Sequence, residues 1–108
     1  MFVVDTGCET LLKEFTERNA GRLTRLEEYH PEIGAQVEER NLPLRGVAYD
    51  RHGRSVEIML GDLATPDGHL TRSIGGVESV DVLPGPDSRD AVLCIGHGAG
   101  QTLLRLIG

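Results

Sequence analysis

Apolar residues recur at helical spacing near the start of the chain. The residues with this spacing are Cys8, Leu11, Leu12 and Phe15. Thr6 and Glu9 have the form of a capping box, in which each side chain accepts a hydrogen bond from the backbone N–H of the other residue. Asn19-Ala20-Gly21 then supplies a stop signal. The pattern predicts an amphipathic helix from Thr6 to Ala20.

From Arg22 onward the pattern changes to short extended runs, which are separated by glycine, proline and aspartate. Leu42-Pro43-Leu44 is expected to interrupt or bulge the sheet, because proline cannot donate a hydrogen bond to a strand ladder. The segment 70–74 is open to interpretation as a strand or as a short helical turn. The extended segments that we expect are 22–29, 33–37, 47–49, 55–60, 70–74, 77–82, 91–95 and 102–107.

Two hairpins are the clearest part of the expected sheet. The first turns at Asp50-Arg51-His52-Gly53, where the glycine can take a positive φ. On its return strand, Val56, Ile58 and Leu60 alternate with more polar residues and so share one face. The second hairpin turns across the glycine-rich segment 96–100. Both patterns predict neighbouring antiparallel strands.

The connections between the expected strands are too short for a crossover helix, which favours antiparallel pairing throughout. The sequence therefore predicts a single α+β domain over residues 1–108. We expect an N-terminal amphipathic helix packed on a strongly bent antiparallel sheet, or small β-barrel, of roughly five to six strands.

Composition mainly argues against certain cores, partners and locations. Hydrophobic residues make up 39% of the chain, aromatic residues only 4%, and there is no tryptophan, so we expect an aliphatic core. The net charge of −6 argues against a nucleic-acid partner, because phosphates attract a basic face. The chain shows no signal-peptide pattern at its start and no apolar run of the ~18 residues that a membrane span needs. We expect a cytoplasmic protein with no membrane partner and with reduced thiols at Cys8 and Cys94.

The residues that could bind a phosphate or a metal lie in or beside the expected turns. Gly96-His97-Gly98-Ala99-Gly100 is glycine-rich, but phosphate-binding loops open a helix, and the segment after this one has the pattern of a strand. Cys94 and His97 are a close pair of metal-type ligands, and no second pair completes a metal site. We therefore predict no metal and no cofactor. The histidines are interpreted as solvated turn residues: His30, His52, His69 and His97.

Nucleophilic catalysis has little support in the sequence. Cys94 with His97, or Ser73 with a nearby acid, could form a catalytic pair only if the fold brought them together. No Gly-x-Ser-x-Gly motif is present, and Cys94 lies between two apolar residues, as a small buried hydrophobe would. Asp50 and His52 are interpreted as turn formers. We predict no catalytic residue, and the sequence leans against an enzyme without deciding the question.

Charged residues cluster in two places. An acidic region comprises Glu27, Glu28, Glu32, Glu38 and Glu39. A basic hairpin tip comprises Arg51, His52 and Arg54. Solvated surfaces explain both clusters. The basic tip is nevertheless a candidate interaction surface for an acidic partner or for a second copy of this acidic chain.

Two segments resemble a family of small bacterial proteins known only as a domain of unknown function. They are Leu42-Pro-Leu-Arg-Gly-Val-Ala-Tyr-Asp50 and His69-Leu-Thr-Arg-Ser-Ile74. The family is similar in length and layout, with an N-terminal helix, a strand that ends in a Leu-Pro-Leu-x-Gly phrase, and a hairpin that bears an aspartate. The resemblance implies this layout and brings no activity, cofactor or catalytic residue.

These observations favour a non-catalytic bacterial interaction or assembly domain, whose partner is a second copy or another protein. The absence of a catalytic constellation, and strands that are apolar on both faces over 42–49, support this hypothesis. A small RNA-binding Sm-like barrel is a second hypothesis. The third is a small-ligand-binding domain, or a minor enzyme that uses Cys94, His97 or His52.

Overall fold

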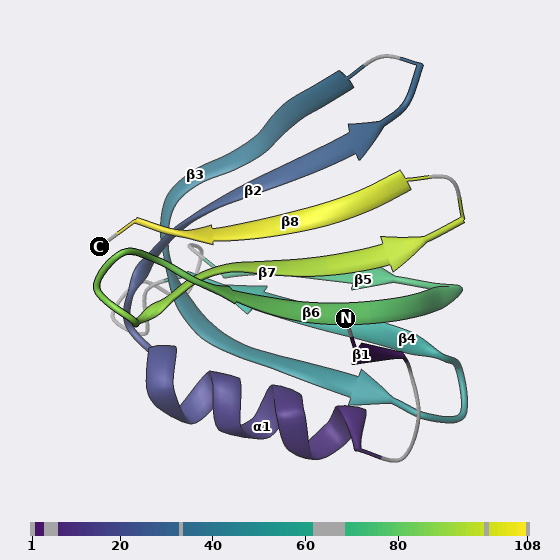
Figure 1. Cartoon of the computed structure of the whole chain (residues 1–108), viewed down its shortest axis with the longest axis horizontal. Coiled ribbons are helices and arrows are strands. Elements are labelled where there is room, and N and C mark those ends of the chain that lie inside the picture. The colour runs from purple at the N-terminus through teal and green to yellow at the C-terminus, as the bar shows by residue number, and fades with distance from the viewer. Residues whose placement is uncertain (1, 4–6, 33, 62–68, 99, 108) are drawn as a thin grey trace.

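A computed structural model describes residues 2–3, 7–32, 34–61, 69–98 and 100–107 (Figure 1). Within them the chain forms one helix followed by an antiparallel sheet, with a short strand before the helix. The elements are β1 (Phe2–Val3), α1 (Cys8–Asn19), β2 (Leu23–His30), β3 (Gly34–Asp50), β4 (Ser55–Leu60), β5 (Leu70–Ile74), β6 (Val77–Pro84), β7 (Asp90–His97) and β8 (Gly100–Leu106). The strand order is β1-β6-β7-β8-β2-β3-β4-β5.

The long strand β3 holds the two parts of the sheet together. Its first part, up to Pro43, pairs with β2, and its second part, from Leu44, pairs with β4. A register shift between Leu44 and Gly46 marks the place where β3 bends from one part into the other (Figure 1). The irregularities lie on either side of Leu42-Pro43-Leu44 rather than within it, because the pairing skips Asn41 opposite β2 and Arg45 opposite β4, and the strand continues through the proline. We call β1, β6, β7, β8, β2 and residues 34–43 the large half-sheet, and residues 44–50, β4 and β5 the small half-sheet.

The sheet is strongly bent but not closed, so the expected small barrel is wrong. β5 and β6 follow each other in the chain, yet they lie near opposite ends of the strand order. Gly75-Gly76 connects them, and Val77 N–H donates to the carbonyl of Arg54 at 3.0 Å. The described residues form eight strands rather than five or six. The two-residue β1 was missed because two residues cannot show a periodic pattern.

The helix prediction is confirmed in its position and its end, but not in its start. α1 begins at Cys8, and its N-cap residue Gly7 makes no side-chain cap hydrogen bond. The predicted capping residue Thr6 lies outside the described residues. The helix ends at Asn19, and Gly21 takes the positive φ of 88° that the stop signal predicted.

Both predicted hairpins are present, with their turn geometry corrected. At the first turn Arg54, not Gly53, takes the positive φ, of 48°. The Asp50 side chain accepts a hydrogen bond from His52 N–H at 3.0 Å, which turns the chain before it reaches Gly53. At the second turn β7 continues to His97, which pairs with Gly100.

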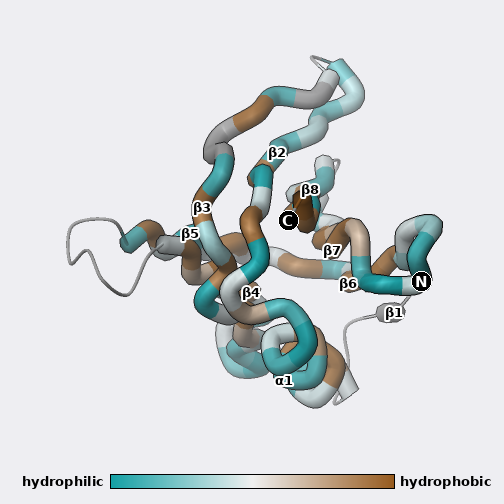
Figure 2. Tube along the Cα trace, turned by 90° about the vertical axis from the view of Figure 1, so that its left-hand side faces the viewer, coloured by the Kyte–Doolittle hydropathy of each residue, from teal (hydrophilic) through white to brown (hydrophobic). Residues whose placement is uncertain are grey.

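The core is aliphatic, as composition predicted, with Phe15 as its largest fully buried side chain. The alternation predicted for β4 is confirmed, because Val56, Ile58 and Leu60 are all fully buried. Figure 2 shows this pattern as hydrophobic positions that alternate with hydrophilic ones along the strands and around α1. The helix contributes Cys8, Leu12 and Phe15 to the same core.

The helix also covers an edge of the small half-sheet. Beyond the bend β3 leaves β2, so its backbone needs new hydrogen-bond partners on that side. The Thr16 hydroxyl oxygen accepts a hydrogen bond from Val47 N–H at 3.0 Å, and it lies 2.9 Å from the carbonyl oxygen of Leu12. Thr16 therefore joins the helix directly to the edge of β3.

The end of α1 is joined to the start of β7 through Asp90. The Asp90 carboxylate accepts hydrogen bonds from Arg18 Nε at 2.9 Å and from Asn19 Nδ2 at 2.7 Å. Arg22 donates to the Asp90 carbonyl at 2.8 Å. Burial raises the pKa of Asp90, but the hydrogen bonds from Asn19 and Arg18 and the charges of Arg18 and Arg22 outweigh it. The pKa of Asp90 therefore lies below its usual 3.8.

Replacing Thr16 by valine should lower the free energy of unfolding by about 1–3 kcal/mol, because Val47 N–H then loses its partner. Urea denaturation followed by circular dichroism measures the loss. Thr10→Val is the matched control, since it makes the same change at an exposed position of α1. Equal losses in the two variants would show that helix propensity, not the contact with β3, causes the effect.

Asp90→Asn should lower the free energy of unfolding at pH 7 by about 1–3 kcal/mol, since it removes a charge that accepts two hydrogen bonds. Because the folded pKa lies below the unfolded one, the wild-type advantage is present above about pH 5 and is lost as the pH falls through the folded pKa. Denaturation midpoints between neutral and strongly acidic pH test this.

The control for Asp90→Asn is Glu14→Gln, which removes an exposed negative charge from α1 and should change stability by less than about 0.5 kcal/mol. A difference between wild type and Asp90→Asn that stayed constant down to strongly acidic pH would contradict the role of the charge.

Candidate functional site

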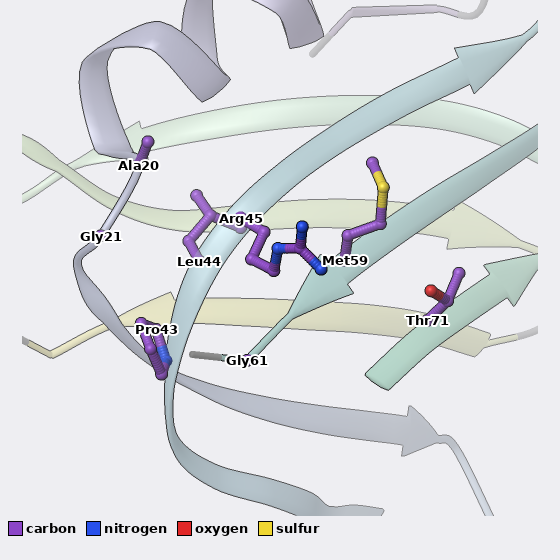
Figure 3. Close-up of a pocket in the computed structure, with 8 residues that line it drawn as sticks. All are labelled: Ala20, Gly21, Pro43, Leu44, Arg45, Met59, Gly61 and Thr71. Atoms are coloured by element: carbon purple, nitrogen blue, oxygen red, sulfur yellow. The ribbon is translucent and has the colours of Figure 1, made fainter. Parts of the chain in front are cut away.

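A groove of about 450 Å³ lies between the end of α1 and the small half-sheet (Figure 3). The turn after the helix, the bend of β3, the end of β4 and the start of β5 all contribute to its walls. The lining residues are Ala20, Gly21, Pro43, Leu44, Arg45, Met59, Gly61 and Thr71. Cavities of this size are in the range of small-molecule sites in proteins.

Backbone hydrogen bonds fix the floor of the groove. Leu44 carbonyl accepts from Gly21 N–H at 2.8 Å, and Leu44 N–H donates to the carbonyl of Arg22 at 2.8 Å. Gly61 N–H donates to the carbonyl of Pro43 at 2.9 Å. These bonds join three chain segments at one place, so the floor is held by the main chain. Gly21 has nothing within 4 Å of the position of a Cβ, which leaves that wall open.

Arg45 is the charged residue of this lining. Figure 3 shows its side chain extending from β3 toward Met59, with Thr71 beyond it on β5. The Arg45 guanidinium lies 2.9 Å from Nδ1 of His69. Because a guanidinium can only donate, His69 accepts this bond at Nδ1. The groove thus combines an apolar floor with an exposed cation, and its described lining residues include no general acid–base pair.

A second polar cluster lies at the far end of the large half-sheet, where His97 hydrogen-bonds to Thr102. His97 is part of β7, and its Nε2 is 2.8 Å from the Thr102 hydroxyl oxygen. The Thr102 hydroxyl donates to the Glu28 carboxylate, so His97 must donate to Thr102. The interpretation of His97 as a solvated turn residue is therefore wrong. Its alternation with Leu93 and Ile95, both buried, was the signal in the sequence.

His30 approaches the same carboxylate. Its Nε2 is 3.9 Å from Glu28 Oε2, and His97 Nε2 is 3.6 Å from it. Gly100 permits this arrangement, because a Cβ there would be 2.8 Å from His30 Nδ1 and from the Tyr29 carbonyl. Among the described residues, no group of three or more histidine, cysteine or acidic side chains is placed to hold a metal ion.

The structure does not bring Cys94, which the sequence analysis considered as a nucleophile, to His97. Cys94 pairs with Asp81 and Leu103 on the face away from the core, whereas His97 continues the row of Leu93 and Ile95, which point inward. Burial raises the pKa of the Cys94 thiol, and the charge of Asp81 raises it further against the opposing effect of Arg105. A raised pKa leaves less thiolate, so Cys94 is a poor nucleophile.

Two members of the acidic region are not solvated as expected. Glu28 has only 13% of its side chain exposed and accepts a hydrogen bond from Thr102. Glu27 is not solvated, because it is only 5% exposed and lies between Arg25 at 2.7 Å and Arg105 at 3.0 Å. The basic tip of Arg51, His52 and Arg54 is exposed on the β3–β4 turn, as predicted. Its role as an interaction surface stays a prediction.

Four of the ten arginines lie close to carboxylates. They are Arg18, Arg25, Arg51 and Arg105, each within 4 Å of a carboxylate that compensates part of its charge. Non-specific nucleic-acid binding depends on uncompensated cations, so these four contribute less to it than their number suggests.

The large half-sheet has one face that points away from the core, here called the outer face. Strand alternation and burial place these described side chains on it: Leu23, Arg25, Glu27, Tyr29, Val37, Asp81, Leu83, Val92, Cys94, Leu103, Arg105 and Ile107. Five of them are large apolar residues with 40–47% of their surface exposed. α1 packs instead against β3 (Figure 1). Sequence alternation alone did not distinguish this face, because it carries both charged and apolar residues.

Comparison with known families gives one match, over residues 5–89. The chain belongs to a family of unknown function, DUF5335. This confirms the resemblance noted in the sequence. No curated protein and no solved structure matches the chain.

The DUF5335 match covers the groove and part of the second polar cluster. The groove residues, from Ala20 to Thr71, all lie inside the matched region. Glu28 and His30 also lie inside it, whereas His97 and Thr102 lie beyond it.

The described part of the chain has no helix that is long and apolar enough to cross a membrane.

Gly100→Ala should lower the free energy of unfolding by about 1–3 kcal/mol, because the new Cβ would collide with the Tyr29 carbonyl and displace His30. Urea denaturation gives the loss. Gly75→Ala is the control, because nothing lies within 4 Å of a Cβ at that position. Stability should there be unchanged or slightly higher. A Gly100→Ala protein as stable as wild type would show that the close approach is not needed.

Proposed function

We propose that this DUF5335 domain is a non-catalytic assembly domain that pairs with a second copy of itself through the outer face. The observation that carries the proposal is the exposure of Leu23, Tyr29, Val37, Leu83 and Ile107 on one side of the large half-sheet. Exposed apolar surface of this kind is typical of interaction sites, because its burial in a complex is favourable.

The cross-strand register adds two partly buried apolar residues, Val92 and Leu103, to this surface. Leu83 pairs with Val92, and Val92 pairs with Arg105, so these side chains form one row across β6, β7 and β8. Cys94, Leu103 and Glu27 form the next row. A standard interface covers about 800 Å² of each partner. That is roughly one-eighth of the 6180 Å² accessible surface of the chain.

Charge balance favours a second copy. The chain carries a net charge of −6, so two copies repel each other unless they meet where the charge is neutral. On the outer face, Arg25 and Arg105 balance Glu27 and Asp81. Arginine beside exposed apolar residues is also a common composition of protein interfaces.

Leu83→Glu tests the pairing, because it replaces an apolar side chain of the outer face by a charged one, at a position that is 43% exposed in the single chain. Size-exclusion chromatography with light scattering at micromolar concentration should give twice 11.7 kDa for wild type and 11.7 kDa for the variant. The change should leave the melting temperature nearly unaltered, since an exposed side chain contributes little to the core.

The matched control is Ala48→Glu, which adds the same charge at an exposed position of the small half-sheet. It should remain dimeric. A wild-type chain that is monomeric over the whole concentration range would refute the proposal, and so would a control that dissociates as readily as Leu83→Glu.

A further inference from the structure

We propose that the groove under Arg45 is a binding site for a small monocarboxylate with an apolar body. This activity is independent of self-association, because no groove residue lies on the outer face. The proposal rests on the combination of an apolar floor, one exposed cation and an open wall.

The floor suits an apolar body. Leu44 is 2% exposed and Pro43 lies beside it, so the groove reaches the margin of the core. Met59 closes one side, and the flexible thioether of methionine adapts to ligands of different shape. The open space beside Gly21 leaves room that a side chain would otherwise fill. Burial of apolar groups on this floor supplies the binding energy.

The cation suits a carboxylate. Arg45 is exposed, and its contact with His69 uses one guanidinium nitrogen, so further N–H donors can face the groove. A guanidinium binds a carboxylate through two parallel hydrogen bonds. The Thr71 hydroxyl lies on the same groove and offers a further donor. None of the described lining residues carries a carboxylate.

A second cavity, of about 380 Å³, lies beside Glu28 and is a weaker candidate. One of its lining side chains, His97, already hydrogen-bonds to Thr102.

Isothermal titration calorimetry at pH 7 tests the site with butanoate, hexanoate and octanoate, and with the alcohols of the same lengths. The affinity for the acids should rise about fourfold for each added methylene until the groove is filled. Each alcohol should bind at least about tenfold more weakly than its acid, because it cannot form the charged pair.

Three variants locate the binding. Arg45→Gln should remove the preference for acid over alcohol and leave alcohol binding unchanged. Thr71→Trp, at an exposed position of β5, should block both ligands by filling the groove. Arg51→Gln removes one positive charge from the distant hairpin tip and should bind as wild type does. Circular dichroism confirms that each variant is folded.

A methyl NMR spectrum of protein labelled at methionine gives a second readout. The Met59 resonance, assigned by its absence in Met59→Leu, should shift as hexanoate is added. The proposal is overturned if acids and alcohols bind wild type equally, if none of them binds, or if Arg51→Gln weakens the acids as much as Arg45→Gln. These outcomes do not depend on dimer formation, so the two proposals can fail separately.

Discussion

The backbone hydrogen bonds at Leu44 are the constraint on which the rest of the structure depends. β3 changes partners there, and the N–H and carbonyl groups that it no longer offers to β2 are taken up by Arg22 and Gly21. The chain that leaves the helix is thereby fixed to the bend of the sheet. This one junction determines where α1 lies, how the two half-sheets are inclined, and where a groove can open.

The same bend separates two surface regions that differ in shape and in chemistry. On the small half-sheet it leaves a recess with an apolar floor and Arg45 at its rim. On the large half-sheet it leaves a broad face on which Glu27 is held between two arginines. A recess suits a small ligand, and a broad face suits a macromolecule, because the area that each can bury differs. One domain can therefore serve a ligand and a partner without conflict.

The sequence predicted those features that arise from local periodicity and turn chemistry. The apolar stripe that includes Leu12 and Phe15 predicted the helix, and the alternation of Val56, Ile58 and Leu60 predicted the return strand of the first hairpin. The bend of β3 and the open edges were not predictable in the same way, because they depend on which strands pair over long distances. The groove was missed for that reason, since its walls come from four separate elements. Glu27 was misread because two arginines, one of them from β8, bury its charge.

The position of β8 has a consequence for the order in which the chain can fold. β8 lies between β7 and β2, so the middle of the large half-sheet is completed only when Thr24 meets Leu106. During synthesis on the ribosome, β2 emerges long before this partner and keeps one backbone edge unsatisfied in the meantime. Pairing of such distant segments is slow, and an unpaired edge invites contact with other nascent chains. The edge of β2 that later pairs with β8 is therefore open to such contacts until the last strand has been synthesised.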